Sequence, residues 1–216
     1  MVQTLAIVAA IAAFLAGNLA PVATAERPVR IVAFGDSLTA GFGLPASASF
    51  PAKLATALKA AGHSIEMTNA GVSGDTASGG LARLDWSVPD GTDAVILELG
   101  ANDMLRGIDP KITRHALDEI VGRLAARGIA VLVTGMRAIP NLGRDFSRDF
   151  EVIYPEIAAK HGALFYPFFL EGIAGEARFN QGDRVHPLAS GVDVIVTNIL
   201  PKVEELLTRA RNKPAP

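Results

Sequence analysis

Short apolar runs alternate along the chain with longer segments in which apolar and polar residues are mixed. Runs of about four to eight apolar, often β-branched residues are typical of buried strands, whereas apolar positions three or four residues apart predict helices. Glycine follows several of the helical segments, where it favours the left-handed backbone that ends a helix. The pattern predicts strands at 29–34, 64–69, 93–99, 129–134 and 163–166, and helices at 51–61, 77–84, 112–127, 146–160 and 188–208.

Proline and charge modify three of these segments. Because proline has no backbone N–H, we expect the helix at 146–160 to break or bend near Pro155, and the last helix to be interrupted near Pro201. The segment 143–150 carries Arg144, Asp145, Arg148 and Asp149, and we interpret it as a solvated charged loop, with a loop that shapes the entrance of a binding site as the alternative.

The order of the elements predicts the fold class. Nearly continuous apolar strands that alternate with helices indicate a parallel sheet covered on both faces. We find no internal repeat, no low-complexity block and no interdomain linker in the sequence. The chain is therefore expected to form a single α/β domain with three layers.

The first 25 residues contain no charged side chain and are mostly Ala, Ile, Val, Leu and Phe, with Ala23-Thr24-Ala25 at the end. This pattern predicts a secretory signal peptide at 1–25, followed by a domain at 26–216 in the periplasm or outside the cell. The alternative is an uncleaved membrane anchor, since no Lys or Arg stands near Met1. The apolar run is, however, shorter than the ~20 residues that a membrane-spanning helix needs.

Composition and motifs exclude several classes of function. The net charge is −2 with no long run of like charges, which argues against nucleic-acid binding, and the chain has no cysteine for disulfides, thiol catalysis or thiolate metal sites. No H-E-x-x-H, no G-x-x-x-x-G-K-[ST] and no G-x-S-x-G occurs. We therefore expect no metal or cofactor.

A candidate nucleophile follows the first predicted strand. The run that ends at Phe34 passes into Gly35-Asp36-Ser37, so that Ser37 stands at the carboxyl end of a strand, where α/β sheets place their ligands. An ordinary turn is the alternative. Serine attacks a carbonyl only when a base removes its proton, and that base usually needs an orienting partner.

The candidate base is one of four histidines. His63, His115 and His161 lie at helix ends or on a helix and are interpreted as capping or surface residues. His186 lies directly before the last helix, and Asp183, three residues earlier, can reach its Nδ1 atom.

Candidate donors for an oxyanion follow the next two strands. Gly74 can bring a backbone N–H close to a ligand, and the side chain of Asn102 is an amide donor. If the strand order begins 2-1-3, Ser37, Gly74 and Asn102 emerge side by side. The neighbouring carboxylates of Asp36, Asp75 and Asp103 are interpreted as turn-bonding, loop-bracing or helix-capping groups.

Four blocks in this order resemble the SGNH, or GDSL-type, hydrolases: Gly35-Asp36-Ser37-Leu38, Gly74, Gly100-x-Asn102-Asp103 and Asp183-x-x-His186-Pro187. The segments 71–76, 80–84 and 105–107 resemble the exported bacterial thioesterase I/lysophospholipase L1 and arylesterase subgroup. The resemblance implies a flavodoxin-like sheet in the order 2-1-3-4-5. It also implies Ser37 as nucleophile, His186 as general base and acid, Asp183 as its orienting partner, and an oxyanion hole from the N–H groups of Ser37 and Gly74 and the side chain of Asn102.

The chain departs from that subgroup at two positions. Ala101 stands where relatives often have glycine, and Met104 where some have a smaller residue, and both are expected to shape the acyl pocket. We therefore expect a serine ester hydrolase that acts on a small acyl ester or thioester. The alternatives are a carbohydrate O-acetyl esterase and an exported protein that binds acyl lipids without turnover. The sequence leaves the oligomeric state open, with a monomer as the working expectation.

Overall fold

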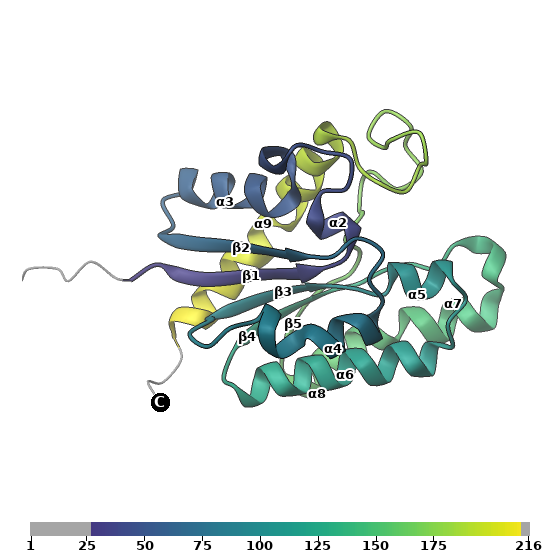
Figure 1. The fold of residues 1–216 in the computed structure, drawn as a ribbon, viewed down its shortest axis with the longest axis horizontal. Helices are drawn as coiled ribbons and strands as arrows, with labels where there is room; N and C mark the ends of the chain where they lie inside the picture. Colours follow the sequence, from purple (N-terminus) through teal and green to yellow (C-terminus); the bar gives the residue numbers. More distant parts are fainter. Residues whose placement is uncertain (1–26, 213–216) are drawn as a thin grey trace, which may run out of the picture.

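A computed structural model describes residues 27–212, which form a five-stranded sheet with helices on both faces (Figure 1). Every neighbouring pair of strands is parallel, and the order is β2-β1-β3-β4-β5. This confirms the three-layer α/β class and the strand order 2-1-3-4-5. The strands are β1 (Val29–Gly35), β2 (Ile65–Gly71), β3 (Ala94–Glu98), β4 (Ala130–Thr134) and β5 (Leu164–Tyr166).

Burial of the strands follows their position in the sheet. All five residues of the central strand β3 are buried, including the carboxyl group of Glu98, whereas β2 at the edge is largely exposed or half-buried. A strand covered on both faces must be nearly continuous in apolar residues, which explains why β1 and β3 gave the clearest strand patterns in the sequence.

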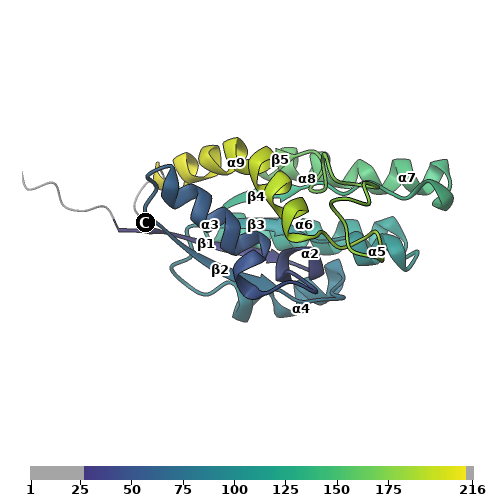
Figure 2. The same cartoon turned by 90° about the horizontal axis from the view of Figure 1, so that it is seen from above.

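Helices cover the two faces of the sheet unequally. On one face, α3 packs against α9, and on the other α6 lies between α4 and α8 (Figures 1 and 2). The short helices α2, α5 and α7 lie beyond the carboxyl ends of the strands. The helical segments are α2 (Ser37–Ala40), η1 (Ala46–Ala48), α3 (Phe50–Ala60), α4 (Ala77–Ser87), α5 (Ala101–Leu105), α6 (Pro110–Ala126), η2 (Pro140–Leu142), α7 (Arg144–Glu151), α8 (Ile153–His161) and α9 (Ala189–Arg211).

The last helix corrects one expectation. Helix α9 runs without interruption through Pro201, which points to solvent. The helix buries Ile199 before the proline and Val203 after it in the core. Burial of a large apolar side chain contributes about 1.5–3 kcal/mol, and this offsets the hydrogen bond that the proline cannot make.

The segment 143–150 also differs from its expected structure. It is not a loop but helix α7, as the predicted helix from 146 implied for most of its length; α7 begins after Gly143 and exposes its charges while it buries Phe150. The break within 146–160 lies at Val152, between α7 and α8, rather than at Pro155. Pro155 lies in the first turn of α8, where the backbone N–H groups have no partner inside the helix and the missing donor costs little.

The predicted signal peptide at 1–25 lies outside the described residues. Among the residues that the structure describes, no helix combines the length and the hydropathy needed to cross a bilayer.

Candidate active site

The sequence-predicted site residues come together at the carboxyl edge of the sheet. Ser37 begins α2 directly after β1, Gly74 lies in the loop after β2, and Asn102 lies in α5 after β3. His186 reaches the same edge from the segment between β5 and α9. The order of the strands therefore gathers residues from four separate parts of the sequence.

Ser37, His186 and Asp183 form a continuous hydrogen-bonded chain. The Oγ atom of Ser37 lies 2.9 Å from Nε2 of His186, and Nδ1 of the same ring lies 2.7 Å from Oδ2 of Asp183. The Ser37 residue is 9 % exposed, so most of it is shielded from solvent. In this arrangement the imidazole can accept the proton of the hydroxyl while the carboxylate holds the ring.

The backbone around Asp183 explains its position. Its Oδ1 atom accepts hydrogen bonds from the backbone N–H groups of Val185 (2.9 Å) and His186 (3.0 Å), which close a tight turn. Arg184 within the turn has a φ of 60°, which is unusual for a residue with a side chain. Hydrogen bonds from the backbone N–H and then the ring of His186 lower the pKa of Asp183 to about 2, which keeps it ionised beside the histidine.

Gln181 joins the segment that holds His186 (residues 181–187, the histidine segment) to the turn that holds Ser37 (residues 35–43, the nucleophile turn). Its Nε2 atom donates hydrogen bonds to the carbonyl oxygens of Phe42 (2.7 Å) and Pro187 (3.0 Å). The Phe42 ring in turn packs on the imidazole of His186, with 4.5 Å between the ring centroids. The side chain of Gln181 was not singled out in the sequence, where only its place in the histidine segment could have drawn attention to it.

Both candidate oxyanion donors after β2 and β3 have a free N–H. The backbone N–H of Gly74, which has a φ of 82°, has no acceptor within the described part of the chain, and the Gly74 carbonyl oxygen accepts from Nη2 of Arg106 at 2.8 Å. The Nδ2 atom of Asn102 donates to Oδ2 of Asp36 at 3.0 Å. An amide nitrogen carries two protons, so one N–H of Asn102 remains for a ligand.

The three neighbouring aspartates hold the loops, as expected. Asp36 accepts from the backbone N–H of Leu38 at 3.0 Å, Asp75 is paired with Arg83, and Asp103 accepts from the backbone N–H of Ala77 at the start of α4. Asp36 has a second role that the sequence did not reveal, since it also holds the amide of Asn102.

Arg83 is a buried bracing residue that sequence reasoning missed. Its guanidinium donates to Oδ2 of Asp75 (2.7 Å) and to the carbonyl oxygens of Ala70 (2.9 Å) and Gly35 (2.9 Å). It also lies over the ring of Phe34 at 4.2 Å. The ends of β1 and β2 and the loop that holds Gly74 are thereby tied to one side chain.

The other three histidines lie away from Ser37, as expected. His63 contacts Glu204 from the end of α3, His161 contacts Asp118 at the end of α8, and His115 is exposed on α6. Only His186, among the described histidines, has both a hydroxyl and a carboxylate as partners.

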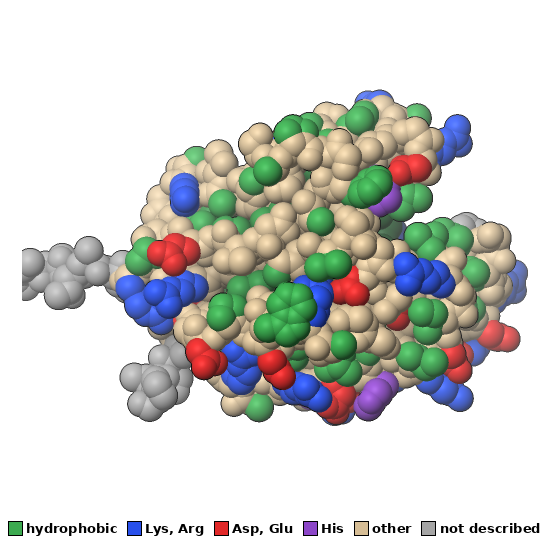
Figure 3. Space-filling model, viewed as in Figure 1, with side chains coloured by type: hydrophobic (Ala, Val, Ile, Leu, Met, Phe, Trp, Pro, Cys, Tyr) green, Lys and Arg blue, Asp and Glu red, His purple; other side chains and the backbone are tan. Residues whose placement is uncertain are grey.

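Exposed apolar side chains lie beside an opening in the surface at the carboxyl edge of the sheet. The space-filling view shows hydrophobic groups on both sides of a notch at the carboxyl edge of the sheet (Figure 3). The exposed large apolar residues on loops and short helices at this edge are Phe42, Val72, Leu105, Val185 and Leu188. Ala101 and Met104, which were expected to shape an acyl pocket, are almost fully buried in the core.

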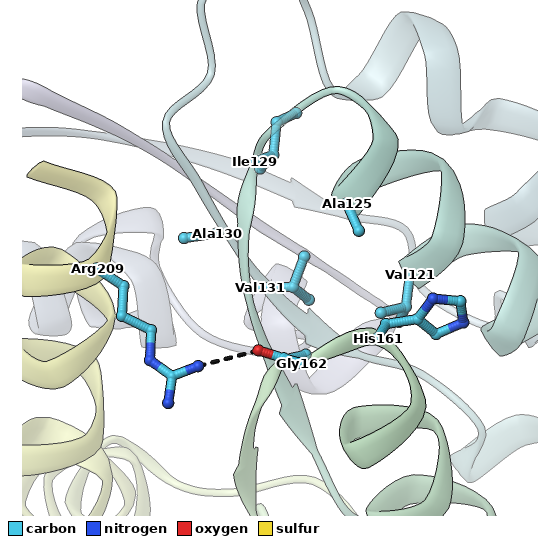
Figure 4. Close-up of a pocket in the computed structure, with 9 residues that line it drawn as sticks. Val121, Ala125, Ile129, Ala130, Val131, His161, Gly162 and Arg209 are labelled. Carbon is cyan, nitrogen blue, oxygen red and sulfur yellow. Dashed lines mark hydrogen bonds between the residues drawn. The ribbon is translucent and has the colours of Figure 1, made fainter. Parts of the chain in front are cut away.

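A small cavity lies elsewhere, between the ends of α6, α8 and α9 and the start of β4 (Figure 4). Arg209 lines it and donates to the carbonyl oxygen of Gly162 at 3.0 Å, opposite mainly aliphatic side chains such as Val121 and Val131. Its lining contains no serine or threonine, and none of the predicted site residues lies there. The candidate active site therefore stays at the carboxyl edge of the sheet.

Comparison with known proteins identifies the family of this chain. Residues 33–194 match the GDSL-like Lipase/Acylhydrolase family. The chain belongs to this family.

Similar curated proteins cover most of this GDSL-family chain. It is 34 % identical over 199 residues to esterase TesA of Pseudomonas aeruginosa, a match that covers 91 % of this chain and 99 % of that protein. It is 36 % identical over 166 residues to an arylesterase of Vibrio mimicus, covering 76 % of this chain and 83 % of that protein. It is 35 % identical over 158 residues to thioesterase 1/protease 1/lysophospholipase L1 of Escherichia coli, covering 73 % and 74 %.

Solved structures agree with the family. The crystal structure of AlinE4, an SGNH-hydrolase family esterase, is 44 % identical, has a TM-score of 0.71 and covers 88 % of this chain and 99 % of its own. The crystal structure of TesA has a TM-score of 0.78 at 34 % identity and covers 82 % and 99 %. This GDSL-family chain is therefore a serine hydrolase of carboxylic esters.

Proposed function

We propose that Ser37 is the nucleophile of this esterase, His186 its general base and acid, and Asp183 the group that orients the imidazole. The observation that carries the proposal is the hydrogen-bonded chain from Ser37 Oγ through both ring nitrogens of His186 to the Asp183 carboxylate. The ionised carboxylate fixes the tautomer in which Nδ1 carries the proton, so that Nε2 is free to accept one.

The reaction then proceeds in two steps through an acyl-enzyme. The Oγ atom of Ser37 attacks the ester carbonyl carbon while Nε2 of His186 takes the hydroxyl proton. The tetrahedral intermediate collapses, the C–O or C–S bond to the leaving group breaks, and His186 gives its proton to the departing alcohol or thiol. A water molecule that is activated by the same histidine then attacks the acyl group, which releases the acid and restores the Ser37 hydroxyl.

We propose that three donors stabilise the negative oxygen of each tetrahedral intermediate: the backbone N–H groups of Ser37 and Gly74 and the side chain of Asn102. The free N–H of Gly74 and the second N–H of Asn102 support this role. Donors held in place before the reaction do not have to reorganise when the charge develops, which is why such groups contribute strongly to the rate.

The substrates are proposed to be acyl esters or thioesters with an apolar acyl group. The apolar side chains around the opening support this choice, since they would contact an aliphatic or aromatic group at the site entrance. The competing substrate class is acetylated sugars, and hydrolysis of acetate esters alone would favour it.

The experiment is hydrolysis of p-nitrophenyl esters from acetate to palmitate, together with labelling by a fluorophosphonate and mapping of the labelled peptide. The wild type is compared with Ser37→Ala and with Ser64→Ala. Ser64 is a matched control because it is exposed just before β2, at the amino ends of the strands and away from Ser37. We expect turnover and labelling to be lost only in Ser37→Ala, with best activity on butyrate or longer esters. Activity confined to acetate would instead favour deacetylation of sugars, and full turnover by folded Ser37→Ala would contradict the proposed nucleophile.

We also propose that residues 1–25 are a cleaved signal peptide and that the esterase acts in the periplasm or outside the cell. The uncharged apolar sequence that ends in Ala23-Thr24-Ala25 supports this. Expression of the full chain in an exporting bacterial host should yield a protein whose intact mass corresponds to a start at Glu26. A mass that retains the first 25 residues would contradict cleavage at this position.

A further inference from the structure

Two carboxyl groups lie buried together beneath the proposed oxyanion donors. Asp36 and Glu98 are both 0 % exposed, although a buried carboxylate is costly unless each oxygen is hydrogen-bonded. Asp36 meets this requirement, because Oδ1 accepts from the backbone N–H of Leu38 and Oδ2 from Nδ2 of Asn102, both at 3.0 Å. Asp36 is thus placed to be the ionised member of the pair.

Glu98 does not meet the requirement as a carboxylate. Its Oε2 atom accepts from the hydroxyl of Thr39 at 2.8 Å and from the backbone N–H of Asp36 at 3.4 Å. Its Oε1 atom is buried and has no hydrogen-bond partner within the described part of the chain. A proton on Glu98 removes this deficit, since it leaves the buried group neutral and able to donate, and the charged carboxylate of Asp36 is its neighbour.

Gly35 makes room for this contact. A Cβ atom at position 35 would lie 2.7 Å from Oε2 of Glu98 and would also overlap the hydroxyl of Thr39. The glycine before Asp36 and Ser37 therefore allows the carboxyl group of Glu98, from the neighbouring strand β3, to lie directly against the nucleophile turn.

We propose that Glu98 and Asp36 share a single proton and act as positioning residues that hold the amide of Asn102 toward the oxyanion. This inference rests on the proposed function. An ionised Asp36 can only accept, so it binds the NH2 end of the amide and turns the second N–H toward the substrate. A proton on Asp36 would allow the amide oxygen to bind there instead, and the proton on Glu98 prevents this.

The surrounding charges are consistent with one proton on the pair. Burial, together with the charge of Asp36, raises the pKa of Glu98 well above its usual range, and burial raises the pKa of Asp36 to about 6. The other titratable and charged groups around the pair are Asp103 on α5, Tyr154 on α8, Arg83 on α4 and His186 in the histidine segment. Arg83 is engaged by Asp75 and by backbone carbonyls, so the described residues offer Glu98 no cation of its own.

The first test is a double-mutant cycle between positions 36 and 102. Asn102→Ala is expected to lower kcat by ~10²–10³. Asp36→Asn should lower kcat by a comparable factor. Because both substitutions act through one amide, the kcat of the double variant should be less than about threefold below that of Asn102→Ala alone. Asp103→Asn is the matched control, because this buried carboxyl group contacts Ala77 and Thr113 rather than Asn102, and its effect should multiply with that of Asn102→Ala. Losses that multiply for Asp36→Asn as well would overturn the positioning role.

The second test concerns the proton itself. Glu98→Gln replaces the neutral acid by an amide with one donor and one acceptor end, and should keep kcat within about threefold of the wild type, whereas Glu98→Leu should lose far more. The infrared spectrum of the folded wild type at neutral pH should contain a protonated carboxyl band that Glu98→Gln lacks and Ser37→Ala keeps. Absence of that band, or an equal loss in both Glu98 variants, would overturn the shared proton.

These two readouts separate the inference from the proposed function. The infrared band is measured on folded protein without turnover, so it bears on Glu98 even if a variant at position 36 does not fold. Full activity of Ser37→Ala would contradict the proposed nucleophile and leave the band unchanged.

Discussion

The Oγ atom of Ser37 lies 2.9 Å from Nε2 of His186, although the two residues are 149 positions apart in the chain. Ser37 is placed by the end of β1, and His186 by a turn in which the carboxylate of Asp183 holds both the backbone and the ring. The contact between the proposed nucleophile and its proposed base therefore depends on how two distant segments pack.

Replacement of His186 by Ala should lower kcat on p-nitrophenyl butyrate by on the order of 10⁴, because Ser37 loses its base. Added imidazole should restore part of the activity by entering the space that the ring leaves. The control is His161→Ala, since His161 also contacts an aspartate, at 2.8 Å, but lies at the end of α8. A similar loss in the control would show that the effect is one of folding.

Asp183 should make the folded state sensitive to acid. Its pKa is about 2 in the folded chain against a usual value of 3.8, so ionised Asp183 stabilises the fold above about pH 4. This contribution is lost as the pH falls from about 4 through about 2, and solvent keeps it small because the side chain is 43 % exposed. Thermal unfolding of the wild type and Asp183→Ala should therefore show a difference in Tm that is largest near about pH 6 and disappears near about pH 2. A difference that does not vary with pH would contradict the assignment.

Gly100 should not tolerate a side chain. It has a φ of 112°, and a Cβ atom there would overlap the hydroxyl of Tyr154, which donates to the carbonyl oxygen of Leu99 at 3.2 Å. We expect Gly100→Ala to lower the free energy of unfolding by more than about 2 kcal/mol, combining backbone strain with the overlap. Gly107→Ala is the matched control, because its φ is 64° but nothing lies within 4 Å of the added Cβ, so only the backbone cost of about 1–2 kcal/mol remains. Urea unfolding measures both, and equal losses would argue against the contact with Tyr154.

Removal of the Arg83 guanidinium should cost stability and activity together. Its ion pair with Asp75 is largely buried, with side-chain exposures of 8 % and 13 %, so Arg83→Met leaves an unpaired buried carboxylate and should cost about 3–5 kcal/mol. Because the same side chain holds the ends of β1 and β2, kcat should fall even at temperatures where the variant remains folded.

An exposed pair provides the comparison for Arg83. Arg114→Met breaks a surface ion pair with Glu156 and should cost less than about 1 kcal/mol with unchanged kcat. A loss of stability in Arg83→Met no larger than this would show that the buried pair does not brace the site.

The sequence was most informative where a strand ends in a short polar motif. The end of β1 identified Ser37, and the spacing of three residues between Asp183 and His186 identified the pair that the structure brings to it. These assignments depend on local patterns, namely the end of an apolar run and a single turn of backbone. The strand order then follows from alternation of strands and helices together with the resemblance to a family.

The residues that were missed act through distant contacts. Glu98 looks like the polar end of an apolar strand, and its burial depends on the missing Cβ of Gly35 on another strand. Arg83 looks like an ordinary polar helix residue, and its partners come from β1, β2 and the loop after β2. The start of helix α7 was taken for a charged loop, although burial of Phe150 on one face stabilises a helix there.

The amide of Gln181, which bonds the carbonyl oxygens of Phe42 and Pro187, joins a segment near the start of the domain to one near its end. Ser37 and His186 belong to these two segments, so the proposed site is complete only when both segments are in place. Recovery of esterase activity during refolding therefore reports the meeting of the two segments, whereas circular dichroism reports the formation of helices and strands.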